Sequence, residues 1–235
     1  MIFYRRWHRP LVLSFDLDDT LYDNTKTINY AEAYSRTLLG VTMLCGRKIT
    51  DKEYSQTRDN ILSILPEAQY DVSLLRYFIY RKLLIQAGWG KYKAAEEAKR
   101  QVDAFIKVRA RIPLEEKNVA IIKELANYYP VYAVSNGNAD ISKTSLKGIF
   151  TDVLYPDVNL PGKPEPDIFI KIAALSGVPI SSLCHIGDRG ETDVCGAINA
   201  GALSIWCTSF RREANELRVL PHVESSLDEL KSILL

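Results

Sequence analysis

Three aspartates lie within four residues near the start of the chain, in the segment SFDLDDT at residues 14–20. The apolar run at residues 11–13 precedes them and has the composition of a buried strand. Side chains alternate between the faces of an extended chain, so we expect Asp16 and Asp18 to point to the same side. Two converging carboxylates repel each other unless a cation lies between them, and Mg²⁺ prefers oxygen ligands. The spacing indicates a metal site, and the alternative is an acidic turn at a strand end.

Four further short apolar runs have the same character, and each indicates a buried strand. They cover residues 131–134, 153–155, 183–186 and 203–207. Helical patterns cover residues 115–129, 167–175 and 192–200. Strands that alternate with helices of this length predict right-handed crossovers and a parallel sheet. The expected fold class is therefore α/β, with a doubly wound parallel sheet.

The segment 24–110 has helical periodicity and few strand signals, although it lies between the first and second predicted strands. Asp71 supplies an N-cap for one helix, and residues 94–109 repeat the apolar pattern of a second. We expect this segment to be a helical cap domain, inserted into an α/β core formed by residues 1–23 and 111–235. Two linkers would join the domains and would let the cap open and close over a site at the strand ends.

The composition is that of an ordinary globular protein, with 47% hydrophobic and 25% charged residues among 235. The 30 basic and 29 acidic residues give a net charge of +1, so no overall field favours nucleic acid or an anionic membrane. The apolar stretch before Asp16 is too short for a signal sequence or a membrane span. We therefore expect a cytoplasmic protein, monomeric or weakly homo-oligomeric, with a small molecule as its partner.

The cysteines do not form a CxxC pair, so a zinc site or a disulfide framework is not expected. They are Cys45, Cys184, Cys195 and Cys207. We predict reduced and mostly buried thiols.

Polar residues follow the predicted strands, at the edge where ligands bind in open α/β sheets. They are Asp16 and Asp18 after the first strand, Ser135 and Asn136 after the second, Lys163 in the loop after the third, and Asp188 and Asp193 after the fourth. Alone, Ser135 would be interpreted as a turn hydroxyl and Lys163 as a solvated side chain. Asp193 alone would be a residue that favours a helix N-terminus. Their convergence on one edge of the sheet favours a common site.

The motifs DLDDT, SNG, GKP and GDRGETD occur in the order found in phosphatases of the haloacid dehalogenase superfamily with a helical cap of the first type. The chain resembles that family over its whole length. The resemblance implies a Rossmann-like core and a phosphoric monoester hydrolase that acts through an aspartyl phosphate. Asp16 would attack phosphorus, and Asp18 would protonate the leaving group and then activate water. Ser135, Asn136 and Lys163 would bind the phosphoryl group.

The same resemblance implies a Mg²⁺ cofactor held by Asp16, by the backbone carbonyl of Asp18 and by Asp188. Asp193 would orient Lys163 or a metal-bound water. Close relatives often carry a further acid at the position of Arg189, so this chain departs from the pattern there.

Three other polar residues near the motifs are expected to have no catalytic role. Asp19 and Asp23 would be structural or solvated. His185 lies inside an apolar run, so we expect a packed core residue rather than a metal ligand.

Asp18 favours a phosphatase over a dehalogenase, because the dehalogenases of this superfamily lack that second aspartate. A phosphomutase stays open, as do sugar phosphates and nucleotides as substrates, and the non-enzyme alternative is a phosphate-sensing regulatory protein. Segments such as MIFYRRWHRP and VLPHVESSLDEL are similar to bacterial cytoplasmic phosphatases that act on flavin mononucleotide (FMN) and on 5-amino-6-(5-phospho-D-ribitylamino)uracil. That similarity implies a substrate from riboflavin biosynthesis. Aromatic residues of the insertion, among them Tyr70 and Tyr80, are expected to form its core rather than to stack on a substrate ring.

Overall fold

The computed structural model describes residues 1–44, 49–210 and 217–235, and these residues form a seven-stranded sheet in the order β1-β7-β6-β5-β2-β3-β4. The strands are β1 (Ile2–Phe3), β2 (Val12–Phe15), β3 (Val131–Val134), β4 (Asp152–Leu154), β5 (Leu183–Gly187), β6 (Leu203–Cys207) and β7 (Val223–Ser225). β1 runs antiparallel to β7, and every other neighbouring pair is parallel. The predicted doubly wound α/β fold is confirmed. The two short outer strands β1 and β7 were not predicted. β1 has only two residues, and β7 has the sequence VES, which lacks the continuous apolar run that marked the other strands.

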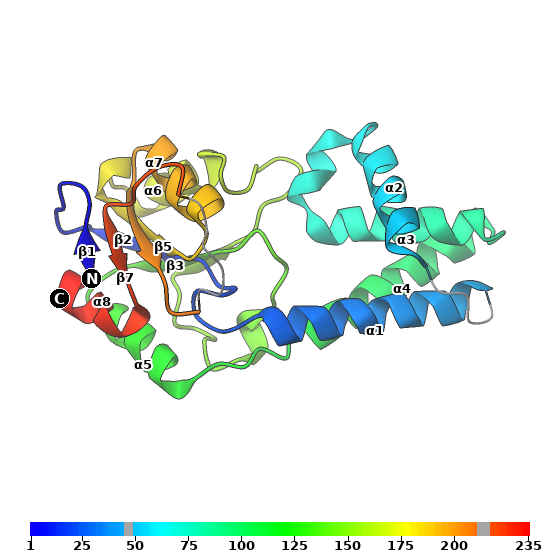
Figure 1. Ribbon diagram of the computed structural model, residues 1–235, viewed down its shortest axis with the longest axis horizontal. Helices are drawn as coiled ribbons and strands as arrows, with labels where there is room; N and C mark the ends of the chain where they lie inside the picture. Colours follow the sequence, from blue (N-terminus) through cyan, green and yellow to red (C-terminus); the bar gives the residue numbers. More distant parts are fainter. Residues whose placement is uncertain (45–48, 211–216) are drawn as a thin grey trace.

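Helices cover both faces of the sheet (Figure 1). They are α5 (Glu116–Leu125) and α8 (Leu230–Leu234) on one face, and α6 (Asp167–Ser176) and α7 (Cys195–Ala200) on the other. The strands are therefore buried on both sides: Leu13 and Phe15 of β2 pack in the cluster that contains α5, and Val12 packs in the cluster that contains α6. This two-sided burial explains why the strands appear as continuous apolar runs.

The predicted helix at 192–200 begins differently from an ordinary α-helix. A π-helical turn, Gly190–Val194, precedes α7 and carries Asp193. Short 3₁₀ helices occur at Pro66–Tyr70, Ile141–Lys143, Ile180–Ser182 and Leu227–Glu229.

Four helices form a separate bundle beside the sheet (Figure 1), which we call the helical unit. They are α1 (Thr25–Leu44), α2 (Asp51–Leu62), α3 (Val72–Gln86) and α4 (Lys91–Arg109). The Asp71 carboxylate caps α3 by accepting hydrogen bonds from the backbone N–H groups of Ser73 and Leu74, as predicted. Tyr80 is buried in the core of the unit, also as predicted, whereas Tyr70 is only half-buried.

Cys184, Cys195 and Cys207 are free and buried, as expected, and Cys45 lies outside the described residues. Within the part of the chain that the structure describes, no helix combines the length and the apolar character that a membrane crossing requires.

Candidate active site

The carboxyl ends of the central strands surround a cavity of about 390 Å³. β2 lies between β3 and β5, so the loops that follow these three strands meet there. All six residues that the sequence analysis assigned to catalysis, substrate binding or metal binding line this cavity: Asp16, Asp18, Ser135, Asn136, Lys163 and Asp188. The sequence therefore predicted which side chains converge.

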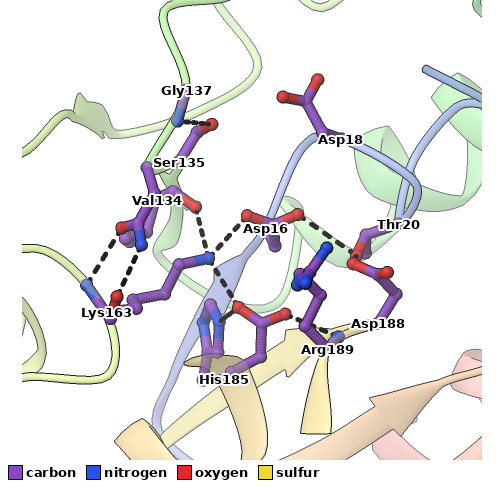
Figure 2. Close-up of polar contacts among 12 residues, drawn as sticks. Asp16, Asp18, Thr20, Val134, Ser135, Gly137, Lys163, His185, Asp188 and Arg189 are labelled. Atoms are coloured by element: carbon purple, nitrogen blue, oxygen red, sulfur yellow. Dashed lines mark hydrogen bonds and ion pairs between the residues drawn. The ribbon is translucent and has the colours of Figure 1, made fainter. Parts of the chain in front are cut away.

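Lys163 is the centre of a buried ion cluster beneath the cavity (Figure 2). Its Nζ donates to Asp16 Oδ1 at 2.5 Å and to the carbonyl oxygen of Val134 at 3.1 Å, and it lies 2.6 Å from Asp193 Oδ1. Burial alone would lower the pKa of Lys163, but the carboxylates of Asp16 and Asp193 outweigh burial and raise it. The ammonium group therefore stays charged, and Asp193 contacts Lys163 as expected.

His185 extends this cluster away from the cavity. Its Nε2 lies 3.1 Å from Asp193 Oδ1, and its Nδ1 lies 2.9 Å from Ser14 Oγ. Burial and then the charge of Lys163 lower the pKa of His185, so the ring is neutral. A neutral ring that donates from Nε2 to Asp193 must accept from the Ser14 hydroxyl at Nδ1. His185 is buried, as predicted, but it belongs to a polar chain that supports Lys163.

Asp193 is fixed by its neighbours on both sides. Its Oδ2 accepts a hydrogen bond of 2.8 Å from the backbone N–H of Arg189. The last residue of β5, Gly187, leaves room for this side chain, because a Cβ at that position would lie 2.3 Å from Asp193 Cγ. The backbone, and not only the charge of Lys163, therefore sets the position of this carboxylate.

The carboxylate oxygens of Asp16, Asp188 and Asp193 lie within 4.8 Å of one another and could hold a metal ion. Burial, together with the neighbouring carboxylates, raises the pKa of Asp16 and raises that of Asp188 to about 7. Such crowded acids favour a cation, and Mg²⁺ prefers oxygen donors of this kind. Asp193 already accepts several protein hydrogen bonds, so Asp16 and Asp188 are the better placed pair. The Thr20 hydroxyl lies between them, 3.5 Å from Asp16 Oδ2 and 3.3 Å from Asp188 Oδ1.

Ser135 and Asn136 stand at the other side of the cavity, directly after β3. The backbone N–H of Gly137 donates to Ser135 Oγ at 3.0 Å, which is the turn geometry that a lone serine predicts. This bond uses Oγ as an acceptor, so the hydroxyl hydrogen can still be donated to a ligand oxygen. The Asn136 side chain bonds both backbone groups of Lys163, at 3.0 Å and 2.5 Å, and so holds the lysine loop in place.

The side chain of Asp18 does not point in the expected direction. It points away from Asp16 (Figure 2), because β2 ends at Phe15 and the alternation of an extended strand does not continue to residue 18. Asp18 Oδ1 accepts hydrogen bonds of 2.5 Å from Tyr22 Oη and from Arg109 Nη2. The second acid of the pair is thus held by a different set of residues from the first.

The neighbouring acids Asp19 and Asp23 accept hydrogen bonds from the backbone. Asp19 has a φ of 58°, and its Oδ1 accepts from the backbone N–H of Asn24 at 2.8 Å. Asp23 Oδ1 accepts from the backbone N–H of Thr25 at 3.0 Å and so caps the start of α1.

Thr20, Tyr22 and Arg109 are site residues that sequence reasoning did not assign. Thr20 and Tyr22 each lie four residues after one of the acids that they contact, which is a weak signal in a turn. Arg109 lies 91 positions from Asp18, and no spacing in the sequence connects the two.

A doubly wound sheet, an acidic pair after its central strand and a buried lysine between carboxylates form a site that is suited to a charged substrate. The profile of the haloacid dehalogenase-like hydrolases matches residues 11–201. The chain belongs to that family.

Individual relatives carry phosphatase names. The chain is 32% identical, over the full length of both proteins, to the 5-amino-6-(5-phospho-D-ribitylamino)uracil phosphatase YigB of Escherichia coli strain K12. It is 25% identical to the glyceraldehyde 3-phosphate phosphatase of Pyrococcus abyssi strain GE5 / Orsay, over 83% of this chain and 80% of the relative. The chain is a phosphoric monoester hydrolase.

A solved structure with the same fold is the 2-haloacid dehalogenase of Pseudomonas syringae pv. Tomato DC3000. Its TM-score is 0.87 at 27% sequence identity, and the match covers 94% of this chain and 96% of that one.

Proposed function

We propose that this chain is a Mg²⁺-dependent phosphatase that hydrolyses a small phosphate monoester through an aspartyl phosphate on Asp16. The observation that carries the proposal is the convergence of Asp16, Ser135, Lys163 and Asp188 from four loops on one cavity. Phosphoryl transfer needs an in-line nucleophile, neutralisation of the phosphoryl oxygens and a proton for the leaving group. These residues and Asp18 supply each of those functions.

In the first step, a carboxylate oxygen of Asp16 attacks phosphorus, and the bond from phosphorus to the leaving alcohol breaks. Asp18 gives its proton to the departing oxygen. The Lys163 ammonium group balances the charge of Asp16 and of the phosphoryl oxygens, and the Ser135 hydroxyl donates to one of those oxygens. In the second step, Asp18 removes a proton from water, which attacks phosphorus and releases inorganic phosphate and free Asp16.

The metal would be held by Asp16, by Asp188 and by the backbone carbonyl of Asp18. The crowded and raised-pKa carboxylates of Asp16 and Asp188 fit such an ion. When bound, Mg²⁺ would supply positive charge next to the phosphoryl oxygens. Arg189 replaces the further acid that relatives often have, and its side chain is exposed at the edge of the cavity.

We further propose that residues 24–110 act as a cap domain over a core of residues 1–23 and 111–235. A second cavity, of about 360 Å³, lies between the start of α3 and the turn after β3. Tyr70, just before α3 of the helical unit, and Tyr155, just after β4, both line it. We call residues 1–23 and 111–235 the sheet region. Asn138 Nδ2 donates to Ser73 Oγ at 3.0 Å, which joins the two units beside this cavity.

The substrate that we propose is a phosphate of riboflavin biosynthesis, 5-amino-6-(5-phospho-D-ribitylamino)uracil, or FMN. Similarity to a phosphatase of that name over the full length of both chains supports this proposal. The tyrosine-lined cavity also supports it, because a planar ring packs well against aromatic side chains. A sugar phosphate is the second candidate, because the glyceraldehyde 3-phosphate phosphatase is similar over most of the chain.

A substrate panel with purified protein and Mg²⁺ tests the proposal. FMN, 5-amino-6-(5-phospho-D-ribitylamino)uracil, glyceraldehyde 3-phosphate and p-nitrophenyl phosphate would be ranked by kcat/KM. We expect repeated turnover, with the riboflavin-pathway esters first and with no release by an Asp16→Asn preparation. Release of only one phosphate per chain would favour a phosphate sensor, and glyceraldehyde 3-phosphate in first place would favour the second candidate.

A further inference from the structure

Arg109 connects the helical unit to the acid of the proposed reaction. It is the last residue of α4, and it is buried with only 1% of its surface exposed. Its Nη2 donates to Asp18 Oδ1 at 2.5 Å, across the boundary between the helical unit and the sheet. The buried face of α4 that contains Val102, Phe105 and Val108 carries the guanidinium group to this position.

The two oxygens of Asp18 have different surroundings. Oδ1 accepts the hydrogen bonds from Arg109 and Tyr22, both at 2.5 Å. Oδ2 lies on the side of Gly137, where a Cβ would be 2.9 Å from Oδ2 and 3.2 Å from Ser135 Oγ. One oxygen is therefore anchored, and the other faces the turn that would bind the phosphoryl group.

Packing alone does not account for an arginine at this position. The Nη1 atom of Arg109 is buried and has no hydrogen-bond partner among the described residues. Burying a guanidinium group with incomplete hydrogen bonding is costly, and an apolar side chain of similar volume would often stabilise a protein more. The contact with the Asp18 carboxylate is what explains a positive charge at this position.

We propose that Arg109 is a positioning residue for the acid–base step. With Tyr22 it anchors Oδ1 of Asp18 and presents Oδ2, the oxygen that carries the proton, to the oxygen of the leaving group. Because Arg109 belongs to the helical unit, the direction of Asp18 depends on where that unit lies. The inference rests on the proposed phosphatase reaction.

The leaving group of the substrate separates positioning from packing. An alkoxide is a poor leaving group and needs the proton of Asp18, whereas p-nitrophenolate leaves with little assistance. The value of kcat/KM includes only the steps up to departure of the leaving group, so the later activation of water by Asp18 does not affect it. A change that misdirects Asp18 should therefore lower kcat/KM for an alkyl ester and not for an aryl ester.

The test compares Arg109→Lys with the wild type on FMN, a primary alkyl phosphate, and on p-nitrophenyl phosphate. Lysine keeps the positive charge but lacks the planar fork of arginine. We expect kcat/KM for FMN to fall by about 10²-fold, at the lower end of what general acid catalysis contributes, with little change for the aryl ester. Tyr22→Phe should show the same selectivity with a smaller effect. Arg111→Lys, an exposed arginine two residues further on, is the matched control and should change neither value.

Other results would overturn the inference. An equal loss for both esters in Arg109→Lys, together with a lower Tm, would make Arg109 a packing residue. A gain for FMN would mean that Arg109 restrains Asp18 instead of presenting it. If the wild type hydrolysed no ester of the substrate panel, the proposed phosphatase function itself would fail. A crystal structure of Arg109→Lys in which Asp18 keeps its direction would also contradict the inference.

Discussion

Asp16 and Asp18 are two residues apart in the sequence, but they differ in burial and in the residues that hold them. Asp16 is buried against Lys163 in a cluster that only the sheet region supplies. Asp18 is partly exposed and is held by Tyr22 on one side and by Arg109 of the helical unit on the other. The residue proposed to attack is therefore independent of the helical unit, whereas the residue proposed to move protons is not. Under the proposed cap role, binding of substrate by the helical unit would control the proton transfer without disturbing the nucleophile.

The largest effect should come from the nucleophile itself. Asp16→Asn removes the oxygen that must bond to phosphorus, so we expect turnover to fall by several orders of magnitude. The Tm should stay close to that of the wild type, because the isosteric amide relieves a crowded set of acids and Lys163 keeps Asp193. Phosphate release with the best substrate of the panel measures the first result, and a thermal melt measures the second. Near-normal turnover would mean that Asp16 is not the nucleophile.

Removal of the metal should also stop turnover, and it has a readout besides activity. EDTA should abolish phosphate release, and Mg²⁺ should restore it. Without substrate, Mg²⁺ at about 100 times its Kd should stabilise the fold by about 2.7 kcal/mol, because the ion binds only the folded chain. Asp188→Asn should lose most of this shift in Tm. Activity that survives exhaustive chelation would contradict a cation between the two acids.

Lys163→Met tests how much the buried side of the site depends on one charge. The change leaves Asp16 and Asp193 buried without their cation, and we expect a loss of about 3–5 kcal/mol in the free energy of unfolding. Denaturant unfolding measures the loss. Lys171→Met, on the exposed face of α6, is the control and should change stability little. A Lys163→Met protein as stable as the control would show that the cluster does not hold the sheet region together.

His185 should give the smallest effect, and only in the dependence on pH. Its pKa is lowered by burial from the ordinary value of 6.5, so the folded chain resists a proton that the unfolded chain takes up. The stability that comes from the neutral ring is therefore present above pH 6.5 and is lost as the pH falls below it. We expect the free energy of unfolding to decline less steeply between about pH 7.5 and about pH 5.5 in His185→Gln than in the wild type. Equal slopes would mean that His185 has the same pKa in the folded and in the unfolded chain.

The sequence predicted the buried side of the site well, because its residues follow strands. Asp188 lies directly after a predicted strand and Lys163 lies in the loop after another, and the geometry of a parallel sheet brings such residues together. Asp18 was assigned to the site but not in its observed direction, because a strand pattern does not say where the strand ends. Arg109 was missed altogether. Its contact depends on how the helical unit packs against the sheet, and an arginine at the end of an amphipathic helix has the same pattern whether it is solvated or buried.

The two linkers that join the helical unit to the sheet region lie next to each other. Thr27, near the start of α1, donates from Oγ1 to the carbonyl oxygen of Arg111, just beyond the end of α4, at 3.3 Å. A segment whose two ends meet can be exchanged without changing the register of the strands on either side. In evolutionary terms, selectivity and chemistry can then vary separately, provided that an incoming segment keeps a side chain that reaches Asp18. A chimaera that takes residues 24–110 from a relative would therefore need an arginine at its last helical position.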